Sequence, residues 1–370
     1  MSRQKLIWSV FVLAGIAVAL GLIFMQRKGG REPIKIGAVL AMTGPGGYGG
    51  EDLRDGMLLA VEEINRWSGI NGRKLELIIE DSKTDPEEGR TAFQKIEAAH
   101  QPLLYVSHLS AISMGLAPLA EKHKVVVVGL VATASELTKQ NDWIFRYYSR
   151  AEHEIPPAIS ILQKLEVKEI GILYLDDEYG RGVFGLLKDA FEKTGGSIKS
   201  QAFNPGETDF KRQITELKDS QVIYVVSLGT YMMKIFRQLK EEGFRRHILA
   251  SHTATWPPIR EMPESEGVYI SSPLIFNADF IFAAELKKNY EARYNRPLTI
   301  YAANGYDFIK FLTGILEDRE LSRESIRSLL EEKFLYTGVF GDLEIKPKEH
   351  EINFSLFPAQ IVNGQIKFID

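Results

Sequence analysis

The sequence predicts an α/β protein with two doubly wound, parallel-sheet lobes in tandem, preceded by one hydrophobic helix at the N-terminus. From Pro33 onward, short apolar runs alternate with amphipathic helical runs. Such alternation is typical of parallel sheets that are covered by helices on both faces. The pattern begins a second round near Phe145–Arg150. With 370 residues, the chain is long enough for two such domains.

The first residues predict a membrane helix. Residues 6–25, LIWSVFVLAGIAVALGLIFM, carry no charge. Twenty residues in a helix span about 30 Å, the thickness of a bilayer core. A secretory signal has a shorter apolar region, although Ala17-Val18-Ala19 would suit a signal peptidase. We therefore favour an uncleaved anchor over a cleaved signal. Basic residues flank the run on both sides, so their charge does not orient it.

The first round of elements follows this anchor. Leu53, Met57 and Ala60 begin an apolar stripe with helical spacing, which predicts a helix over 52–67. Asp85-Pro86 predicts the start of the next helix, because Asp caps a helix and proline suits its first position. The complete round has strands at 34–40, 75–80, 103–107 and 125–130, with helices at 52–67, from 85, and at 111–123.

The second round has the same form and a different ending. Helices are expected at 152–165, 181–194, 209–218 and 231–243, and strands at 170–175, 197–203, 222–228 and 247–251. Helices at 278–295, 299–317 and 322–333 and short strands after Val339 follow.

This tail is expected to return and complete both lobes rather than to build a third core. The resulting chain crossings would form a hinge. We assign 1–32 to the anchor and linker, 33–147 with 276–337 to lobe 1, and 148–275 with 338–370 to lobe 2.

Composition excludes several function classes. The chain has no cysteine, which excludes disulfides, thiolate metal sites, cysteine nucleophiles and a lipidated N-terminal cysteine. Its net charge is −4, and residues 1–31 contain five bases and no acid. The remainder is therefore more acidic still, which argues against a protein that binds nucleic acid through a basic face.

Gly44-Pro45-Gly46-Gly47-Tyr48-Gly49 matches the dinucleotide-binding pattern G-x-G-x-x-G and follows a strand. The next helix, however, opens with Glu51-Asp52, whose charges would repel a pyrophosphate. Glycines 49 and 50 also lengthen the loop, and the acids at 80–81 lie too far along the chain to bind a ribose. A mobile turn is one alternative. We favour a ligand-binding loop that presents Tyr48 at the carboxyl edge of the sheet.

No catalytic, cofactor or metal site is expected. The sequence lacks a G-x-S-x-G nucleophile motif, a phosphate-loop Gly-Lys and metal-binding histidine spacing. His153, between Glu152 and Glu154, is assigned to a solvated helix face. In lobe 2, DDEYGRG (176–182) places Tyr179 as TGPGGYGG places Tyr48. Two such tyrosines suit a small apolar or amphipathic ligand, unless both simply pack beneath turns.

The order of several segments resembles the leucine/isoleucine/valine-binding proteins, periplasmic receptors of ABC importers. The resemblance runs from about Pro33 to Gly341 and includes IKIGAVLAMTGPGGYGGEDLRDGMLLAVEEIN, SHLSAISMGLAP, VATASELT, FRYYSRAEHE, YLDDEYGRG, NPGETDFKRQITELK, EGVYISSP and YAANGYDFIKFL. It implies the type I periplasmic-binding fold, with three crossovers, a ligand in the cleft and closure on binding. It also implies an extracytoplasmic location and ABC-importer membrane subunits as partners. A sensing receptor that is not coupled to transport is the alternative, and a nucleotide-using enzyme is a weaker one.

The resemblance also implies the site residues. The carboxylate of the ligand would meet Ser110, Ala111, Val131 and Thr133 in lobe 1, with Ala111 at the place of the family's main serine. Tyr48 and Tyr179 would form aromatic walls, and Gly229 with Tyr231 a further contact loop.

The family's acid that pairs the α-ammonium falls on His252 here, and residues 247–256 contain no acid. Asp176, Asp177 or Glu178, from the neighbouring loop, is the alternative source of an acid. We expect a small amino acid or a related carboxylate or amide as ligand, and we expect compounds without the ammonium to bind better.

Overall fold

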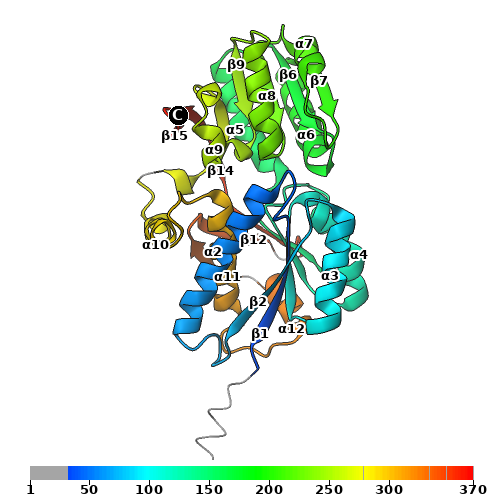
Figure 1. The fold of residues 1–370 in the computed structure, drawn as a ribbon, viewed down its shortest axis with the longest axis vertical. Coiled ribbons are helices and arrows are strands. Elements are labelled where there is room, and N and C mark those ends of the chain that lie inside the picture. Colours follow the sequence, from blue (N-terminus) through cyan, green and yellow to red (C-terminus); the bar gives the residue numbers. More distant parts are fainter. Residues whose placement is uncertain (1–31, 278, 333, 347, 370) are drawn as a thin grey trace, which may run out of the picture.

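The computed structural model describes residues 32–369 except residues 278, 333 and 347, and shows two α/β lobes stacked end to end (Figure 1). The sheet of lobe 1 has the strand order β11-β12-β13-β5-β4-β3-β1-β2, and that of lobe 2 the order β15-β14-β10-β9-β8-β6-β7. Within each, the first five strands along the chain are parallel and share one order. The predicted tandem of doubly wound lobes is confirmed.

Lobe 1 contains the predicted elements with changes at their ends, and one further strand, β5, that the sequence analysis did not predict. Helices α3 and α4 cover one face of the sheet, and α2 with α11 cover the other (Figure 1). Asp85 caps α3 by accepting hydrogen bonds from the Glu87 and Glu88 backbone nitrogens, and Pro86 takes the first position. The elements are β1 (Ile34–Leu40), α2 (Gly47–Arg66), β2 (Leu75–Asp81), α3 (Pro86–His100), β3 (Leu104–His108), α4 (Ser110–His123), β4 (Val127–Leu130) and β5 (Ile144–Tyr147).

Lobe 2 repeats this order after the first crossing. Its core is apolar on both sides of the sheet, since the middle of β8 is completely buried. The elements are α5 (Ala151–Lys164), β6 (Glu169–Leu175), α6 (Glu178–Lys193), β7 (Ser197–Phe203), α7 (Lys211–Leu217), β8 (Val222–Val226), α8 (Gly229–Glu241), β9 (His247–Ala250), η2 (His252–Thr255), α9 (Pro257–Arg260) and β10 (Tyr269–Pro273).

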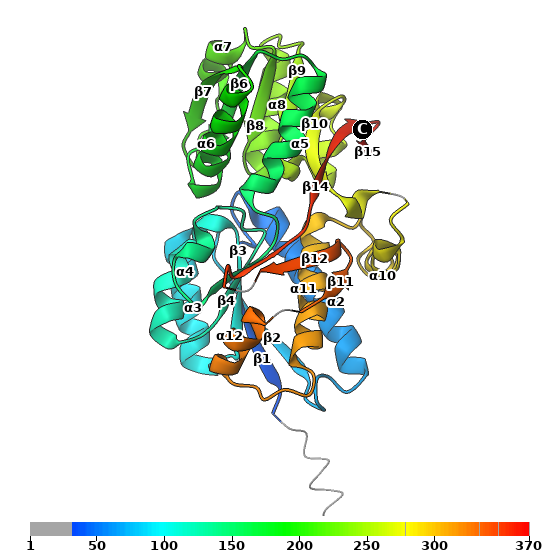
Figure 2. The same ribbon diagram turned by 180° about the vertical axis from the view of Figure 1, so that it is seen from behind.

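The tail completes both lobes, as expected, but its crossing lies later than predicted. The strands β11 (Tyr336–Gly338), β12 (Gly341–Lys346) and β13 (Glu351–Asn353) extend the sheet of lobe 1. Only β14 (Leu356–Val362) and β15 (Gln365–Phe368) join lobe 2 (Figure 2). Residues 338–353 therefore do not belong to lobe 2, because β13 pairs with β5 of lobe 1. The helices before them are α10 (Ala284–Tyr294), α11 (Ile300–Leu316) and α12 (Arg323–Glu331).

The glycine segment differs from its prediction as well. Helix α2 begins at Gly47 rather than at residue 52, so Gly49 and Gly50 form its first turn and do not lengthen the loop. A Cβ at Gly50 would lie 1.9 Å from the Ala41 carbonyl oxygen, so only glycine allows the helix to start this close to the end of β1. Tyr48 consequently stands on the first turn of a helix.

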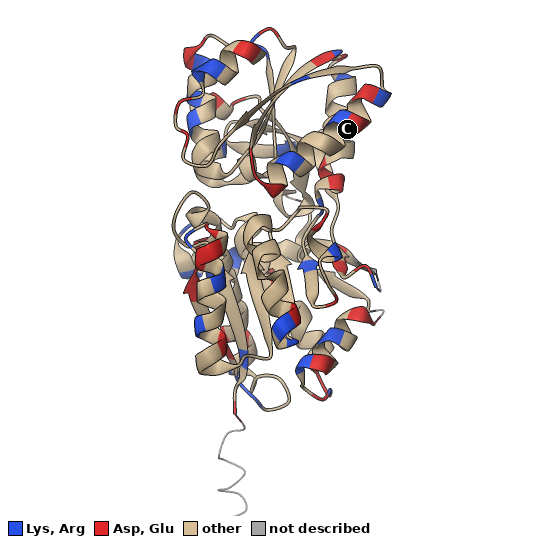
Figure 3. Cartoon of the chain, turned by 90° about the vertical axis from the view of Figure 1, so that its right-hand side faces the viewer, with Lys and Arg blue, Asp and Glu red and all other residues tan. Residues whose placement is uncertain are grey.

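Charged residues lie mainly on the outer helices and loops (Figure 3). No helix among the described residues is long and apolar enough to cross a bilayer. The predicted membrane helix at 6–25 lies outside the described residues.

Candidate functional site

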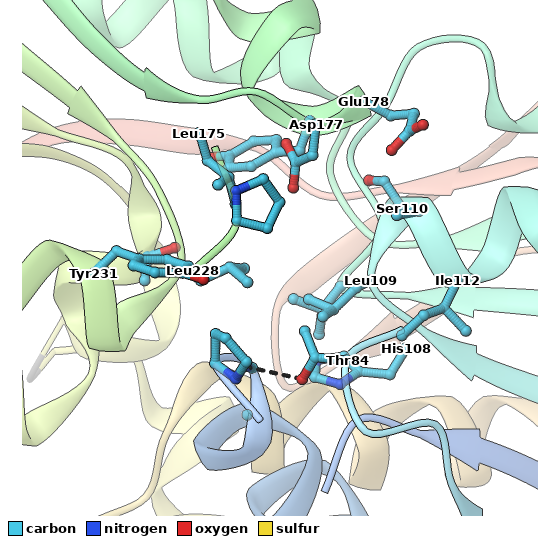
Figure 4. A pocket seen from close by; sticks show the side chains of 18 of the residues that line it. Thr84, His108, Leu109, Ser110, Ile112, Leu175, Asp177, Glu178, Leu228 and Tyr231 are labelled. Carbon is cyan, nitrogen blue, oxygen red and sulfur yellow. Dashed lines mark hydrogen bonds between the residues drawn. The ribbon is translucent and has the colours of Figure 1, made fainter. Parts of the chain in front are cut away.

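A cavity of about 500 Å³ lies between the two lobes. Lobe 1 contributes the segments 45–49, 83–86, 108–112 and 131–133, and lobe 2 contributes 175–181, 205–206, 228–231 and 252–253. Most of these segments follow the carboxyl ends of strands, where open α/β sheets bind ligands. Leu175, Leu228 and Tyr231 of lobe 2 face Leu109 and Ile112 of lobe 1 across the space (Figure 4). The volume is in the range of small-molecule sites.

The start of α4 forms the polar part of the lobe 1 wall. Ser110 and Ala111 open this helix and line the cavity. The first N–H groups of a helix have no acceptor within the helix, and the helix dipole favours an anion there. Ala111 has no hydroxyl, so it offers only its backbone. This wall is suited to a carboxylate.

Ser110 also holds a neighbouring turn in place, a role that the sequence does not indicate. Its hydroxyl oxygen accepts hydrogen bonds from the backbone nitrogens of Thr133 at 3.0 Å and Ala134 at 3.1 Å. Both lone pairs of the hydroxyl are thereby used, and its proton remains to be donated. Ser110 therefore ties the turn after β4 to the start of α4.

Two strained residues bring these segments to the cavity. Leu109, at the N-cap of α4, has φ 71° and ψ 150°, a region that is essentially restricted to glycine. Val131, after β4, has φ 52° although its side chain is β-branched. Both line the cavity. Strain of this kind is maintained where the surrounding structure over-determines it, and it concentrates at ligand sites.

Arg146 supports the same turn from beneath. It is fully buried and donates hydrogen bonds to the carbonyl oxygens of Ala132 at 3.0 Å and Ala134 at 2.6 Å. Its Nη2 lies 3.5 Å from Glu351 Oε1. Burial lowers the pKa of Arg146 to about 10, so the guanidinium stays charged at neutral pH.

Tyr48 forms the aromatic wall of lobe 1 and reaches the other lobe. Its ring centre lies 4.2 Å from that of Trp256 and 5.5 Å from that of Tyr301. Its hydroxyl oxygen accepts a hydrogen bond from the Gly229 backbone nitrogen at 2.8 Å. Thr230 Oγ1 donates to the Pro45 carbonyl oxygen at 3.2 Å. The lobes are thus bridged at one edge of the cavity.

His108 is a cavity residue that the sequence interpretation missed. It ends β3 and is buried, and neither ring nitrogen has a hydrogen-bond partner among the described residues. Burial lowers its pKa to about 3, so the imidazole is neutral. The signal was present in the sequence, because His108 directly precedes the loop at the carboxyl end of a strand.

Lobe 2 presents a histidine, a tyrosine and a buried carboxylate. Glu154, on the first turn of α5, is completely buried. The Tyr179 hydroxyl donates to its Oε1 at 3.1 Å, and His252 Nδ1 lies 3.2 Å from the same oxygen. His252 and Tyr179 line the cavity. Residues 247–256 contain no acid, as the sequence indicates, and the carboxylate that contacts His252 comes from α5.

Glu154 was not predicted as a site residue, and only its neighbour His153 was assigned to a solvated helix face. Ala158 and Ile161, four and seven residues further on, are buried core residues of α5. That spacing places Glu154 on the buried face, and it is the signal that could have identified it.

The rim of lobe 2 is acidic. Asp176, Asp177 and Glu178 all line the cavity, as does Arg181, whose Nη1 lies 2.7 Å from Asp176 Oδ1. Asp177 caps α6 by accepting from the Gly180 nitrogen at 2.8 Å, and burial raises its pKa to about 6. These carboxylates disfavour a phosphate ligand, and no cluster that could hold a metal ion occurs among the described residues.

The structure brings together seven of the eight residues predicted for the site. The seven that line the cavity are Tyr48, Ser110, Ala111, Val131, Thr133, Tyr179 and His252. Gly229 is not among the lining residues and instead donates its N–H to Tyr48. Tyr231, from the same loop, does line the cavity and accepts a hydrogen bond from the Gly206 nitrogen at 2.8 Å. Whether these residues bind a ligand remains a prediction.

Comparisons with known proteins agree on one family. A family model described as periplasmic binding protein matches residues 33–365. A leucine-, isoleucine-, valine-, threonine- and alanine-binding protein of Pseudomonas aeruginosa is 27% identical over 333 residues, which cover 87% of this chain and 88% of that protein. The Leu/Ile/Val-binding protein of Escherichia coli K12 is 26% identical over 251 residues, 65% of this chain and 68% of that protein.

Solved structures share the fold. One is the substrate-binding protein LivJ of a branched-chain amino acid transporter from Streptococcus pneumoniae, solved in complex with isoleucine. Its TM-score is 0.82 at 22% sequence identity, and the matched region covers 91% of this chain and 99% of that chain. A solute-binding protein of an ABC transporter from Rhodopseudomonas palustris, in complex with 3,4-dihydroxybenzoic acid, has a TM-score of 0.81 at 18% identity over 91% and 96% of the two chains. At these identities the likeness confirms the fold alone, and this fold accommodates both ligands.

Proposed function

The chain belongs to the periplasmic binding protein family, and from this premise we propose that it captures a small amino acid with an apolar side chain between its lobes. It then delivers this ligand to the membrane subunits of an ABC importer. Its role is binding and not catalysis, in keeping with the family. The proposal rests above all on the cavity, which is lined by the carboxyl ends of strands from both sheets.

The two walls support an amino acid as ligand. The start of α4, with Ala111 and the Ser110 hydroxyl, suits the carboxylate. Leu109, Leu175 and Leu228 offer apolar surface to a side chain. The relatives from Pseudomonas aeruginosa and Escherichia coli bind branched-chain amino acids by their names. We take leucine as the representative ligand, in place of the deaminated compounds expected from the sequence.

We further propose that residues 6–25 anchor the chain in the cytoplasmic membrane, with the lobes on the extracytoplasmic side. The uncharged run of 20 residues supports this placement. Full-length protein should sediment with membranes, and a protein consisting of residues 32–370 should be soluble. Recovery of a mature protein that lacks residues 1–19 from the soluble extracytoplasmic fraction would contradict the anchor.

A thermal-shift screen of residues 32–370 tests ligand capture. Compounds that bind only the folded state raise the melting temperature. The screen comprises the standard amino acids, aromatic acids, short amides and urea, and we expect leucine, isoleucine and valine to give the largest shifts. If none of these compounds raises the melting temperature, the proposed function is contradicted.

A cavity-filling variant shows where the ligand binds. Ala111→Trp places an indole at the start of α4, inside the cavity. We expect it to abolish the shift that leucine causes. Ala98→Trp, on the exposed side of α3, is the matched control and should retain the shift. An equal shift in Ala111→Trp would place the ligand elsewhere.

A further inference from the structure

We propose that Glu154 and His252 act together as the receptor for the ammonium group of the ligand. The imidazole makes the contact, and the buried carboxylate behind it supplies the negative charge. This inference rests on the proposed function and specifies how lobe 2 selects the ligand.

The contact between the two side chains determines which imidazole nitrogen is offered. His252 Nδ1 lies 3.2 Å from Glu154 Oε1. An ionised carboxylate only accepts hydrogen bonds, so Nδ1 must carry the proton of this contact. In the neutral imidazole, Nε2 is then an acceptor. The pair therefore presents an acceptor, which suits an N–H donor of the ligand.

The acceptor nitrogen is reached from the cavity. His252 lines the cavity and retains about 4% of its side-chain exposure. Its Nε2 forms no hydrogen bond with the described part of the chain. Nε2 is also absent from the set of polar atoms that are both fully buried and without a partner, so it is not fully buried. That small exposure therefore includes Nε2, and the ammonium of a ligand in the cavity can donate to it.

Glu154 needs a positive charge that the protein does not supply. It is completely buried, and of the described residues no Lys or Arg lies within 4 Å of its carboxylate. Its other side-chain partner is the neutral hydroxyl of Tyr179. A buried carboxylate without a counter-charge is costly. An ammonium at His252 Nε2 would place a positive charge one imidazole away from it.

The other groups around the pair bring no competing cation. Tyr148 packs against His252 with ring centres 5.5 Å apart, and Tyr179 lies 6.1 Å away. Both are phenols, and burial raises the pKa of each well above its usual value, so both stay neutral. Asp177 lies on the same side of the cavity and is acidic. The surroundings of His252 thus favour a cationic donor.

Calorimetric titration of residues 32–370 with L-leucine and with 4-methylpentanoic acid tests this inference. The two compounds differ only in the amino group. Wild-type protein should bind leucine at least about tenfold more tightly. Glu154→Gln and His252→Gln should each lower this preference by about ten- to hundredfold, the range of a hydrogen bond to a charged group. The loss should come from leucine, while the affinity for 4-methylpentanoic acid stays within about threefold.

Glu97→Gln is the matched control. Glu97 is also a buried glutamate, but it lies away from the cavity and its carboxylate is paired with an arginine, since Arg323 Nη2 lies 2.9 Å from its Oε2. This variant should keep the wild-type preference. Binding of 4-methylpentanoic acid also shows that each variant is folded.

Three results would overturn the inference. An unchanged preference in both variants, or an equal loss of affinity for both compounds, would assign the pair a structural role. A wild-type protein that prefers 4-methylpentanoic acid would refute the ammonium receptor and leave capture of a small carboxylate intact. Binding of neither compound would contradict the proposed branched-chain ligand itself.

Discussion

The hydroxyl oxygen of Tyr48 in lobe 1 accepts a hydrogen bond of 2.8 Å from the backbone nitrogen of Gly229 in lobe 2. The two residues are separated by 181 positions in the chain and begin helices α2 and α8. This bond crosses between the lobes at the edge of the cavity and so depends on their separation. We expect it to stabilise the arrangement in which the cavity is enclosed.

Tyr48→Phe should weaken ligand binding without unfolding the protein. The change removes the bridging hydrogen bond and keeps the ring that packs on Trp256. A neutral hydrogen bond is worth about 0.5–1.5 kcal/mol, so the affinity for leucine should fall about two- to tenfold in calorimetry. Tyr306→Phe removes a hydroxyl that bonds Glu63 within lobe 1, and should leave affinity unchanged. Equal effects of the two substitutions would show that the bridge has no role in binding.

Closure itself should be visible in solution scattering. Two lobes joined by crossing segments near 148–150, 274–277 and 354–355 are expected to rotate as rigid bodies. Saturating leucine should reduce the radius of gyration of residues 32–370, and Ala111→Trp should show no change. The closure hypothesis is wrong if leucine binds in calorimetry and the scattering curve stays the same.

The strain at Leu109 predicts an unusual response to glycine. At φ 71° and ψ 150° a glycine fits without steric cost, whereas leucine bears about 1–3 kcal/mol. Leu103 is the control, because it is a half-buried leucine whose φ is not positive. Both Leu109→Gly and Leu103→Gly should lower the free energy of unfolding, but the loss for Leu109→Gly should be about 1–3 kcal/mol smaller. Urea denaturation measures both values. Equal losses would argue that Leu109 is not strained.

His108 should make the protein sensitive to acid. Burial lowers its pKa to about 3, so below the unfolded-state pKa only the unfolded chain takes up this proton. The contribution of His108 to stability should therefore fall by about 1.4 kcal/mol per pH unit below about pH 6.5. In urea denaturation, the difference in unfolding free energy between wild type and His108→Gln should shift in favour of the variant from pH 7 to pH 5. A pH-independent difference would contradict this prediction.

Much of the fold was predictable because the hydrophobic pattern of each segment favours the same helix or strand that the tertiary structure contains. Strand β7, at Ser197–Phe203, begins and ends where the sequence predicts, and Asp85 caps α3 as expected. The tail was harder to place, since the short strands β11 to β13 carry no signal that distinguishes one sheet edge from another. They join lobe 1 through the pairing of β13 with β5, which is a tertiary property.

The candidate site was partly predictable. Thr133 and His252 were expected from the resemblance to the family, and both line the cavity. Glu154 was missed because it lies on a helix and reaches the site through His252. The tie between Ser110 and the turn after β4 was missed because it joins two segments 23 positions apart.

A crystal structure of residues 32–370 grown with L-leucine would show directly whether the interlobe cavity captures the amino acid. We expect leucine in the interlobe cavity, with its carboxylate at the start of α4 near Ala111 and its ammonium within hydrogen-bonding distance of His252 Nε2. Leucine bound outside the cavity, or a cavity that holds only water at saturating leucine, would contradict it.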